Sequence, residues 1–288
     1  MAVNYAAKYS QQVDERFKLG ALTSSLVNYA FEWLGVSTVK VYSMPTAAMG
    51  DYTTEGASRY GTPEELGNEV QEMTLAKDRA FTFTIDKKSE DDTMRTMEAG
   101  AALRRQIDEV VIPEIDTYRI AKLVAGADAG NIVKDTAVTK ANAYEKFLAV
   151  QEILDNKKVP TGGRICICTP GYYNMLKLDE AFTKKGDMAT QIAINGLVGE
   201  VDGVYFVKAP KSYFPEKVHF IITNPIVMPS PIKLAEYKIH DDAPGISGYL
   251  VEGRVRYDAF VLNKKKDAIG VCEDPTEYKR KYGWKKNG

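Results

Sequence analysis

Few side chains of this sequence have the types and spacing that catalysis or metal binding requires. Cys166 and Cys168 are separated by one residue, while Cys272 is far away in the chain. A zinc site would need further Cys or His ligands at regular spacing, and none is near. Because alternate residues of a strand point to the same face, we expect both thiols to enter one apolar core. We therefore predict no metal site and no cofactor.

The two histidines, His219 and His240, provide little evidence for catalysis. His240 stands beside Asp241 and Asp242, which is half of a His–Asp catalytic pair. Such a pair also needs a nucleophile on a strained turn, and no Gly-x-Ser-x-Gly occurs, so we interpret His240 as a surface loop residue. The acidic pairs at 64–65, 90–92 and 241–242 lie in polar loops or helix starts, where solvated caps are common. We predict that the protein is not an enzyme. The alternative is an enzyme of unrecognised type, which a deep pocket with convergent titratable groups would support.

The composition is that of a folded protein with unevenly distributed charge. The chain has 288 residues, 44% of them hydrophobic, and its 38 basic and 39 acidic residues give a net charge of -1. These values exclude disorder and a wholly basic nucleic-acid binder. Residues 264–288 carry eight basic and four acidic side chains, hence +4, which leaves -5 for the rest. This tail could contact nucleic acid, contact an acidic neighbour, or be solvated. Tyr278, Tyr282 and Trp284 favour docking on a protein surface.

No segment has the length and hydrophobicity of a signal peptide or a membrane span. We therefore expect the protein to fold in a cytoplasm and to have no membrane partner.

Two predicted strands enclose a long excursion. Residues 36–43 are rich in β-branched side chains, and residues 79–86 alternate, with Phe81, Phe83 and Ile85 on one face. The segment between them contains several turn-forming glycines and is too long for a tight hairpin. We predict a two-stranded ribbon with a charged tip. Such a ribbon is marginal alone and needs a partner surface, within the chain or on another chain.

The strongest helix signal covers residues 90–125. Apolar residues recur at helical spacing, and the segment ends at Gly126. Pro113 lies inside it and should kink or divide the helix. A helix of this length spans about 50 Å, which indicates an elongated molecule.

The remaining segments predict an α+β protein. We expect helices at 142–157 and 170–178, and strands at 164–169 and 218–223. A hairpin should turn on Asp202-Gly203. A second hairpin is predicted from 249–262 with 266–271. The strands before and after this body should share a sheet beside the long helix.

This order of elements resembles the major capsid protein of tailed bacteriophages, the Hong Kong 97 type of fold. Several short sequence segments are similar to segments of that family. They are Arg-Tyr-Gly-Thr-Pro-Glu-Glu-Leu at 59–66, Phe-Thr-Phe-Thr-Ile-Asp-Lys at 81–87, Ala-Leu-Arg-Arg-Gln-Ile-Asp at 102–108, Ile-Pro-Glu-Ile-Asp-Thr-Tyr-Arg at 112–119, Val-Gly-Glu-Val-Asp-Gly-Val at 198–204 and the segment 257–269. The specificity lies in their number and order. The resemblance covers roughly residues 3–272.

The resemblance implies a division of the chain. It consists of an N-terminal arm (1–36), an extended β-loop (37–88), a spine helix of the peripheral domain (89–126), an axial domain (127–235), returning strands of the peripheral domain (236–272) and a basic C-terminal tail (273–288). The arm and the extended loop would lie on neighbouring subunits.

The resemblance also implies a structural function. The subunit would assemble with itself into hexamers and pentamers of an icosahedral virion head, in the host bacterial cytoplasm. The head would enclose double-stranded DNA through non-specific contacts. A separate scaffolding protein, a portal and decoration proteins would be partners. The alternative is an encapsulin-like shell of a bacterial nanocompartment. Candidate inter-subunit ion pairs, each worth at most about 1 kcal/mol, involve Arg59, Glu64, Glu65, Arg104, Arg105, Asp108 and Glu109.

Overall fold

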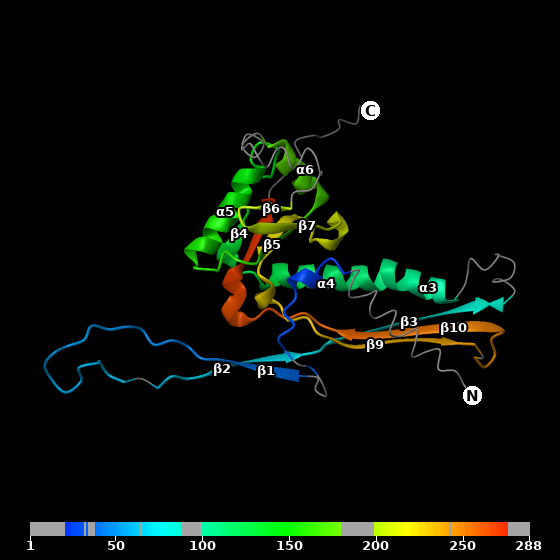
Figure 1. Cartoon of the computed structure of the whole chain (residues 1–288), viewed down its shortest axis with the longest axis horizontal. Coiled ribbons are helices and arrows are strands. Elements are labelled where there is room, and N and C mark those ends of the chain that lie inside the picture. Colours follow the sequence, from blue (N-terminus) through cyan, green and yellow to red (C-terminus); the bar gives the residue numbers. More distant parts are fainter. Residues whose placement is uncertain are drawn as a thin grey trace, which may run out of the picture.

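The structure is a computed structural model that describes residues 21–31, 33, 38–63, 65–87, 99–179, 199–241 and 243–275. A long lower layer of helix and sheet lies beneath a compact body, and a narrow ribbon leaves the lower layer at one end (Figure 1). The elongated shape agrees with the prediction from the long helix.

The lower layer contains a three-stranded antiparallel sheet in the order β3-β10-β9. The strands are β3 (Lys77–Asp86), β9 (Ile232–His240) and β10 (Gly248–Tyr257). The predicted alternation is confirmed, because Phe81, Phe83 and Ile85 pack in one cluster with apolar residues of the long helix. The sheet therefore buries one face against the helix and leaves its other face polar.

The long helix is divided into three parts. They are α3 (Ala99–Gln106), a π-helical turn η2 (Ile107–Val111) and α4 (Ile112–Gly126). The division falls just before Pro113, as predicted. Proline has no N–H, and its ring clashes with the carbonyl group of the residue four positions earlier, so the regular hydrogen-bond ladder opens there. The residues before 99 that the helix prediction included lie outside the described part.

The compact body is built on a six-stranded mixed sheet in the order β4-β11-β8-β5-β7-β6. Its strands are β4 (Ile132–Val133), β5 (Arg164–Cys168), β6 (Glu200–Val201), β7 (Val204–Lys208), β8 (Val218–Thr223) and β11 (Ile269–Glu273). The helices α5 (Ala143–Asn156) and α6 (Pro170–Leu178) pack on one face. On the other face, Ile120 and Leu123 of α4 pack against the sheet. The body and the lower layer thus share α4.

Strand pairing confirms one predicted hairpin and contradicts the other. The hairpin at Asp202-Gly203 is confirmed, with positive φ at both residues. The second predicted hairpin is wrong, because β10 belongs to the three-stranded sheet and β11 to the six-stranded one. Residues 269–272 of β11 are all buried, so this strand needs a place inside a covered sheet. The predicted block 236–272 therefore divides between two sheets, and its boundary with 127–235 falls within β9.

Short 3-10 turns connect these elements. They are η1 (Ser24–Leu26), η3 (Ala129–Asn131), η4 (Lys211–Tyr213), η5 (Pro225–Val227) and η6 (Asn263–Ala268). Residues near η1 pack on the chain's own body: Leu26 and Val27 are buried against α4 and the six-stranded sheet, and Asn28 forms a bridge with Pro229. The part of the predicted arm before residue 21 lies outside the described residues.

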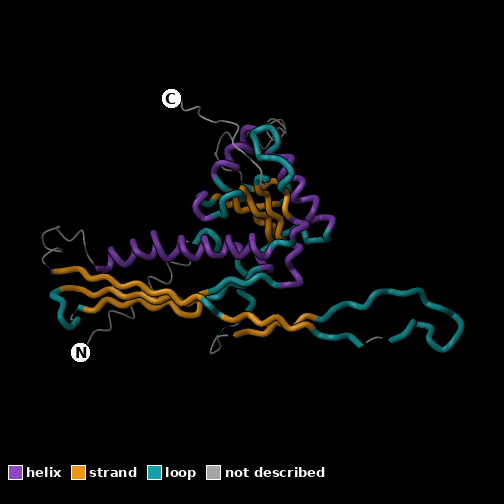
Figure 2. Tube along the Cα trace, turned by 180° about the vertical axis from the view of Figure 1, so that it is seen from behind, coloured by secondary structure: helices purple, strands orange, loops and turns teal. Residues whose placement is uncertain are grey.

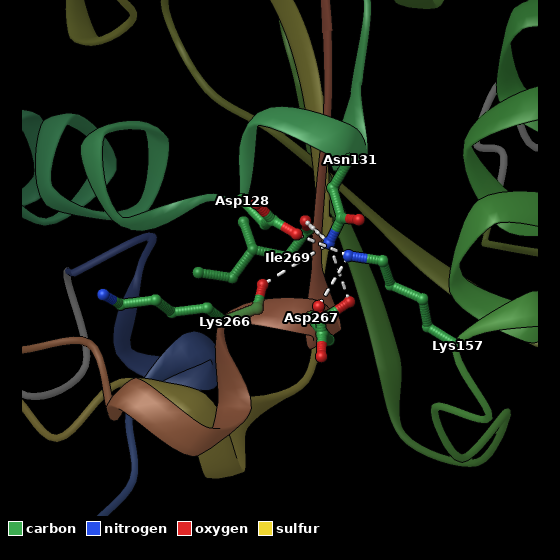
Figure 3. A network of polar contacts seen from close by, with 6 residues as sticks. All are labelled: Asp128, Asn131, Lys157, Lys266, Asp267 and Ile269. Atoms are coloured by element: carbon green, nitrogen blue, oxygen red, sulfur yellow. Dashed lines mark hydrogen bonds and ion pairs between the residues drawn. The ribbon is translucent and has the colours of Figure 1, made fainter.

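A polar corner joins α4, α5 and η6 (Figure 3). Lys157, just after α5, forms ion pairs of 2.6 Å with both Asp128 and Asp267. The fully buried Asn131 donates through Nδ2 to the carbonyl oxygens of Asp267 at 2.9 Å and Ile269 at 3.0 Å. These contacts fix the path by which the chain leaves η6 and enters β11.

Candidate assembly surfaces

Among the described residues, the ribbon packs on the body only at its root. Its strands β1 (Thr38–Ser43) and β2 (Glu69–Thr74) pair antiparallel, so 38–43 pairs with 69–74 and not with 79–86. One face of the root packs on an apolar cluster around Trp33, Met73 and Leu262. The other face is solvent-exposed and carries the Lys40–Glu72 ion pair at 2.7 Å. Beyond β1 and β2 the chain leaves the body without folding back on it (Figure 2).

The ribbon tip, residues 44–68, exposes large apolar side chains. Met49 is 100% exposed and Tyr60 is 92% exposed. The tip has local order, since the rings of Tyr52 and Tyr60 lie 5.0 Å apart and Thr53 N donates to Arg59 O at 3.1 Å. Exposed apolar side chains gathered on one projection mark an interaction site more often than a free surface.

A groove lies between the ribbon root and η6, with a volume of about 520 Å³. We call it the root groove. Its lining includes Phe31, Val41, Gln71, Leu262, Asn263, Lys264 and Lys265. Leu262 is buried, and Phe31 and Val41 are half-buried, so its floor is apolar. Its charged residues are Lys264 and Lys265 against a single acid, Glu69, so its rim is net basic.

The predicted inter-subunit residues fall into two groups at opposite ends of the lower layer. Arg59 and Glu65 are exposed on the ribbon tip, and Glu64 lies outside the described residues. Arg104, Arg105 and Glu109 are exposed along α3 and η2, and Asp108 is half-buried there. Figure 1 shows the tip and α3 far apart, so the fold does not bring the two groups together within one chain. Their role in contacts between copies stays a prediction.

The cysteines are structural, as predicted. Cys166, Cys168 and Cys272 are free thiols, and all lie in the apolar core beneath α5 and α6. Burial raises the pKa of the Cys166 thiol, and it raises that of Cys272 to about 12. A thiol that stays protonated is a poor nucleophile and a poor metal ligand.

Each of the two histidines lies close to a carboxylate. His240 ends strand β9, and so is not in a loop as predicted; its Nε2 lies 3.2 Å from Glu252 Oε2. His219 is half-buried near the start of β8, where its Nε2 lies 2.9 Å from Asp274 Oδ2. In the described ranges no group of His, Cys, Asp and Glu residues could hold a metal ion. No helix in the same ranges has the length and apolar character to cross a membrane.

Comparison with known proteins identifies the class of this molecule. The model of a family described as phage capsid protein matches residues 69–272. A solved structure titled "Mycobacterium phage Che8" has a TM-score of 0.64 at 14% identity, covering 86% of this chain and 89% of that chain. The mature capsid of bacteriophage PhiM1 has a TM-score of 0.63 at 13% identity, covering 87% and 90%. A virus-like particle from Pyrococcus furiosus has a TM-score of 0.57 at 13% identity, covering 94% and 100%. None of the curated proteins matches the chain.

The fold is therefore a viral shell fold of the Hong Kong 97-like type. The chain belongs to the phage capsid protein family. The resemblance drawn from the sequence is confirmed in its family and in its α+β fold.

Sequence reasoning missed the root groove and the apolar character of the tip. Met44, Met49, Tyr52 and Tyr60 stand among Gly, Thr and Ser residues, and this run of large apolar side chains in a turn-rich segment was an available signal. The groove had no such signal, because Gln71 and Lys265 are distant in sequence and meet only through tertiary structure.

The exposed tip predicts a pattern of limited proteolysis. Chymotrypsin should cut the unassembled chain first after Tyr52 and Tyr60, because both are exposed on a narrow projection that can enter a protease. Mass spectrometry of early fragments measures this. The double variant Tyr52→Ala/Tyr60→Ala should lose those first cuts, and Tyr172→Phe, which keeps a chymotrypsin site buried in the body, should keep them. First cuts within α5 or the six-stranded sheet would contradict the prediction.

Proposed function

We propose that this capsid protein is the major head subunit of a tailed bacteriophage. It assembles with itself into hexamers and pentamers of an icosahedral head that encloses double-stranded DNA. The observation that carries the proposal is the ribbon, which extends away from the described body (Figure 1) and whose tip exposes Met49 and Tyr60. A subunit that works alone would gain nothing from such a tip, whereas neighbouring subunits can bury it. The role is structural and not catalytic.

We propose that each segment of the chain has the structural role that the family resemblance implies. Residues 37–88 act as the extended loop, 89–126 as the spine helix, 127–235 as the axial domain and 236–272 mainly as the peripheral sheet. Residues 1–36 form the arm, with 21–28 as its anchor on the body. The basic tail, 273–288, contacts an acidic neighbour or DNA.

The proposed assembly takes place in the host cytoplasm and uses further partners. A scaffolding protein, a portal and decoration proteins complete the head, and DNA is held by non-specific contacts with its phosphates. The exposed ion-pairing residues on the tip and on α3 add small contributions that count only when summed over many copies.

A nanocompartment shell is the second candidate. It is favoured by the full-length coverage of the virus-like particle from Pyrococcus furiosus, although its TM-score is lower than those of the phage structures quoted above. The contents of the shell distinguish the two candidates.

Electron microscopy of the purified chain, alone and co-expressed with phage structural proteins, tests the proposal. We expect closed polyhedral shells, with the tip protected from chymotrypsin once assembled. Co-expression with portal and terminase should yield DNA-filled heads, whereas an enzyme cargo inside would support the nanocompartment. A protein that stays monomeric under all these conditions would contradict both shell functions.

A further inference from the structure

The root groove contains a cation that lacks an anionic partner. Lys265 is half-buried, and its Nζ lies 3.4 Å from the carbonyl oxygen of Ile226. Among the described residues it forms no ion pair, and burial lowers the pKa of its ammonium group. The neighbouring Lys264 is already paired with Glu69 at 2.7 Å. A partly desolvated ammonium group gains from an incoming carboxylate, so the groove favours an acidic occupant.

The walls of the groove are fixed in place. Gln71 on β2 donates through Nε2 to the carbonyl oxygen of Val261 at 2.9 Å. Its Oε1 accepts from the backbone N–H of Asn263, also at 2.9 Å. One amide thus clamps the ribbon root to η6 at both of its polar atoms. A preformed groove with an apolar floor binds without the cost of ordering its own walls.

The ribbon tip has the complementary chemistry. Its described charged residues are Asp51, Glu55 and Glu65 against a single Arg59, so it is acidic. It also presents the exposed rings of Tyr52 and Tyr60, which can fill an apolar floor. Large rigid rings beside a charge are the residue types that anchor protein interfaces.

The outer part of the tip, around Glu55 and Tyr60, cannot reach the groove of its own chain. The groove lies at the root of the ribbon, and residues 44–55 in extended form span about 40 Å at roughly 3.3 Å per residue. Figure 2 shows the tip directed away from its own root. Contact between them must therefore join two copies. Because it pairs two different surfaces, it is a head-to-tail contact, which closes into rings or continues as a filament.

We infer that the root groove is the seat of the acidic, aromatic ribbon tip of a second copy, with Lys265 as the cation that receives its carboxylates. The inference rests on the proposed self-assembly and specifies which two surfaces carry it. Each copy gives its tip to one neighbour and receives the tip of another.

Disulfide trapping tests the seat directly. In the double variant Tyr60→Cys/Asn263→Cys of the full chain, oxidation of the assembled protein should link copies in series, because the native thiols are buried and do not compete. A non-reducing gel should show a ladder, at yields about fivefold above the control Tyr60→Cys/Lys140→Cys, whose second thiol lies on an exposed site of the body. Shells without a ladder above the control would overturn the seat and leave the shell function standing.

Charge exchange provides a second test. Lys265→Glu and Glu55→Lys should each lower the shell yield by about tenfold, since every subunit repeats the contact, and the combined variant should restore it. Lys140→Glu is the matched control and should assemble normally. If Lys265→Glu lowers DNA retention but leaves shell yield unchanged, nucleic acid occupies the groove and the inference is wrong. If the wild-type chain forms no shells, the proposed function fails. The disulfide ladder, measured in smaller oligomers, still shows whether the tip of one copy binds in the root groove of another.

Discussion

Replacing Asp116 by alanine should lower the free energy of unfolding by about 3–5 kcal/mol. The Asp116 carboxylate is fully buried on α4 and accepts hydrogen bonds from the backbone N–H groups of Leu22 and Thr23 and from the Thr23 hydroxyl. Close by, the buried guanidinium of Arg119 donates to Ser230 Oγ at 2.8 Å and to Thr23 Oγ1 at 3.1 Å. Alanine leaves buried donors without an acceptor and a buried cation without its countercharge. Losing both interactions costs more free energy of unfolding than losing one ordinary hydrogen bond.

Urea unfolding of the full chain measures this effect. The control is Glu109→Ala, an exposed acid at the π turn of the same long helix, whose free energy of unfolding should change by at most about 0.5 kcal/mol. An Asp116→Ala variant as stable as the control would show that residues 21–28 are not anchored by this carboxylate.

The same carboxylate should give the wild type a distinct pH dependence. Burial raises the pKa of Asp116, although the Thr23 hydrogen bond and the charge of Arg119 act in the opposite direction. A carboxyl group whose pKa is raised by folding contributes stability below its unfolded pKa and loses it as pH rises through the folded value. The stability of the wild type relative to Asp116→Asn should therefore fall as pH rises from below 3.8 through the acid range. If the stability of the wild type relative to Asp116→Asn instead rises with pH in this window, folding lowers the pKa of Asp116.

Replacing Gly270 by valine should lower the free energy of unfolding by about 3 kcal/mol and the Tm by roughly 6–10 °C. Gly270 lies on β11 where α5 crosses the sheet, and a Cβ atom there would stand 2.4 Å from Val150 Cγ1 and 3.6 Å from Leu154 Cδ1. Both side chains are fully buried, so they have little space into which to move. Gly270→Ala should have a smaller effect of the same sign.

Gly171 offers a matched control within the same body. It lies in α6, and a Cβ atom there would have no neighbour within 4 Å. Gly171→Ala should therefore raise the free energy of unfolding by about 0.5–1 kcal/mol, through helix propensity and a less flexible unfolded chain. Thermal unfolding of both variants measures the contrast. Equal Tm values would show that α5 can shift away from β11 without cost.

The local sequence pattern was sufficient to predict most individual helices, strands and turns. The alternation of Phe81, Phe83 and Ile85 predicted β3 and its buried face, because side chains of a strand alternate whatever the strand pairs with. Pro113 predicted the division of the long helix, since its missing N–H is a property of the residue itself. The Asp202-Gly203 turn was predictable because both residues tolerate positive φ.

Strand partners were harder to predict. β1 pairs with β2 and β11 pairs with β8, and neither pairing follows from the spacing of the strands in the sequence. The choice depends on which apolar faces can be covered at the same time, and that is a property of the whole chain. The same reason explains why Cys166 and Cys272, distant in sequence, share one core.

The sequence by itself determined the family, the α+β class, the long divided helix and the presence of a ribbon that needs a partner. The order of local segments carries this information, and each segment follows from side-chain spacing and turn chemistry. Only the tertiary structure decided that the ribbon stands free of its own body and that Gln71 and Lys265 form a groove at its root. Such a pocket arises from contacts between residues far apart in the chain, so no local pattern could have revealed it.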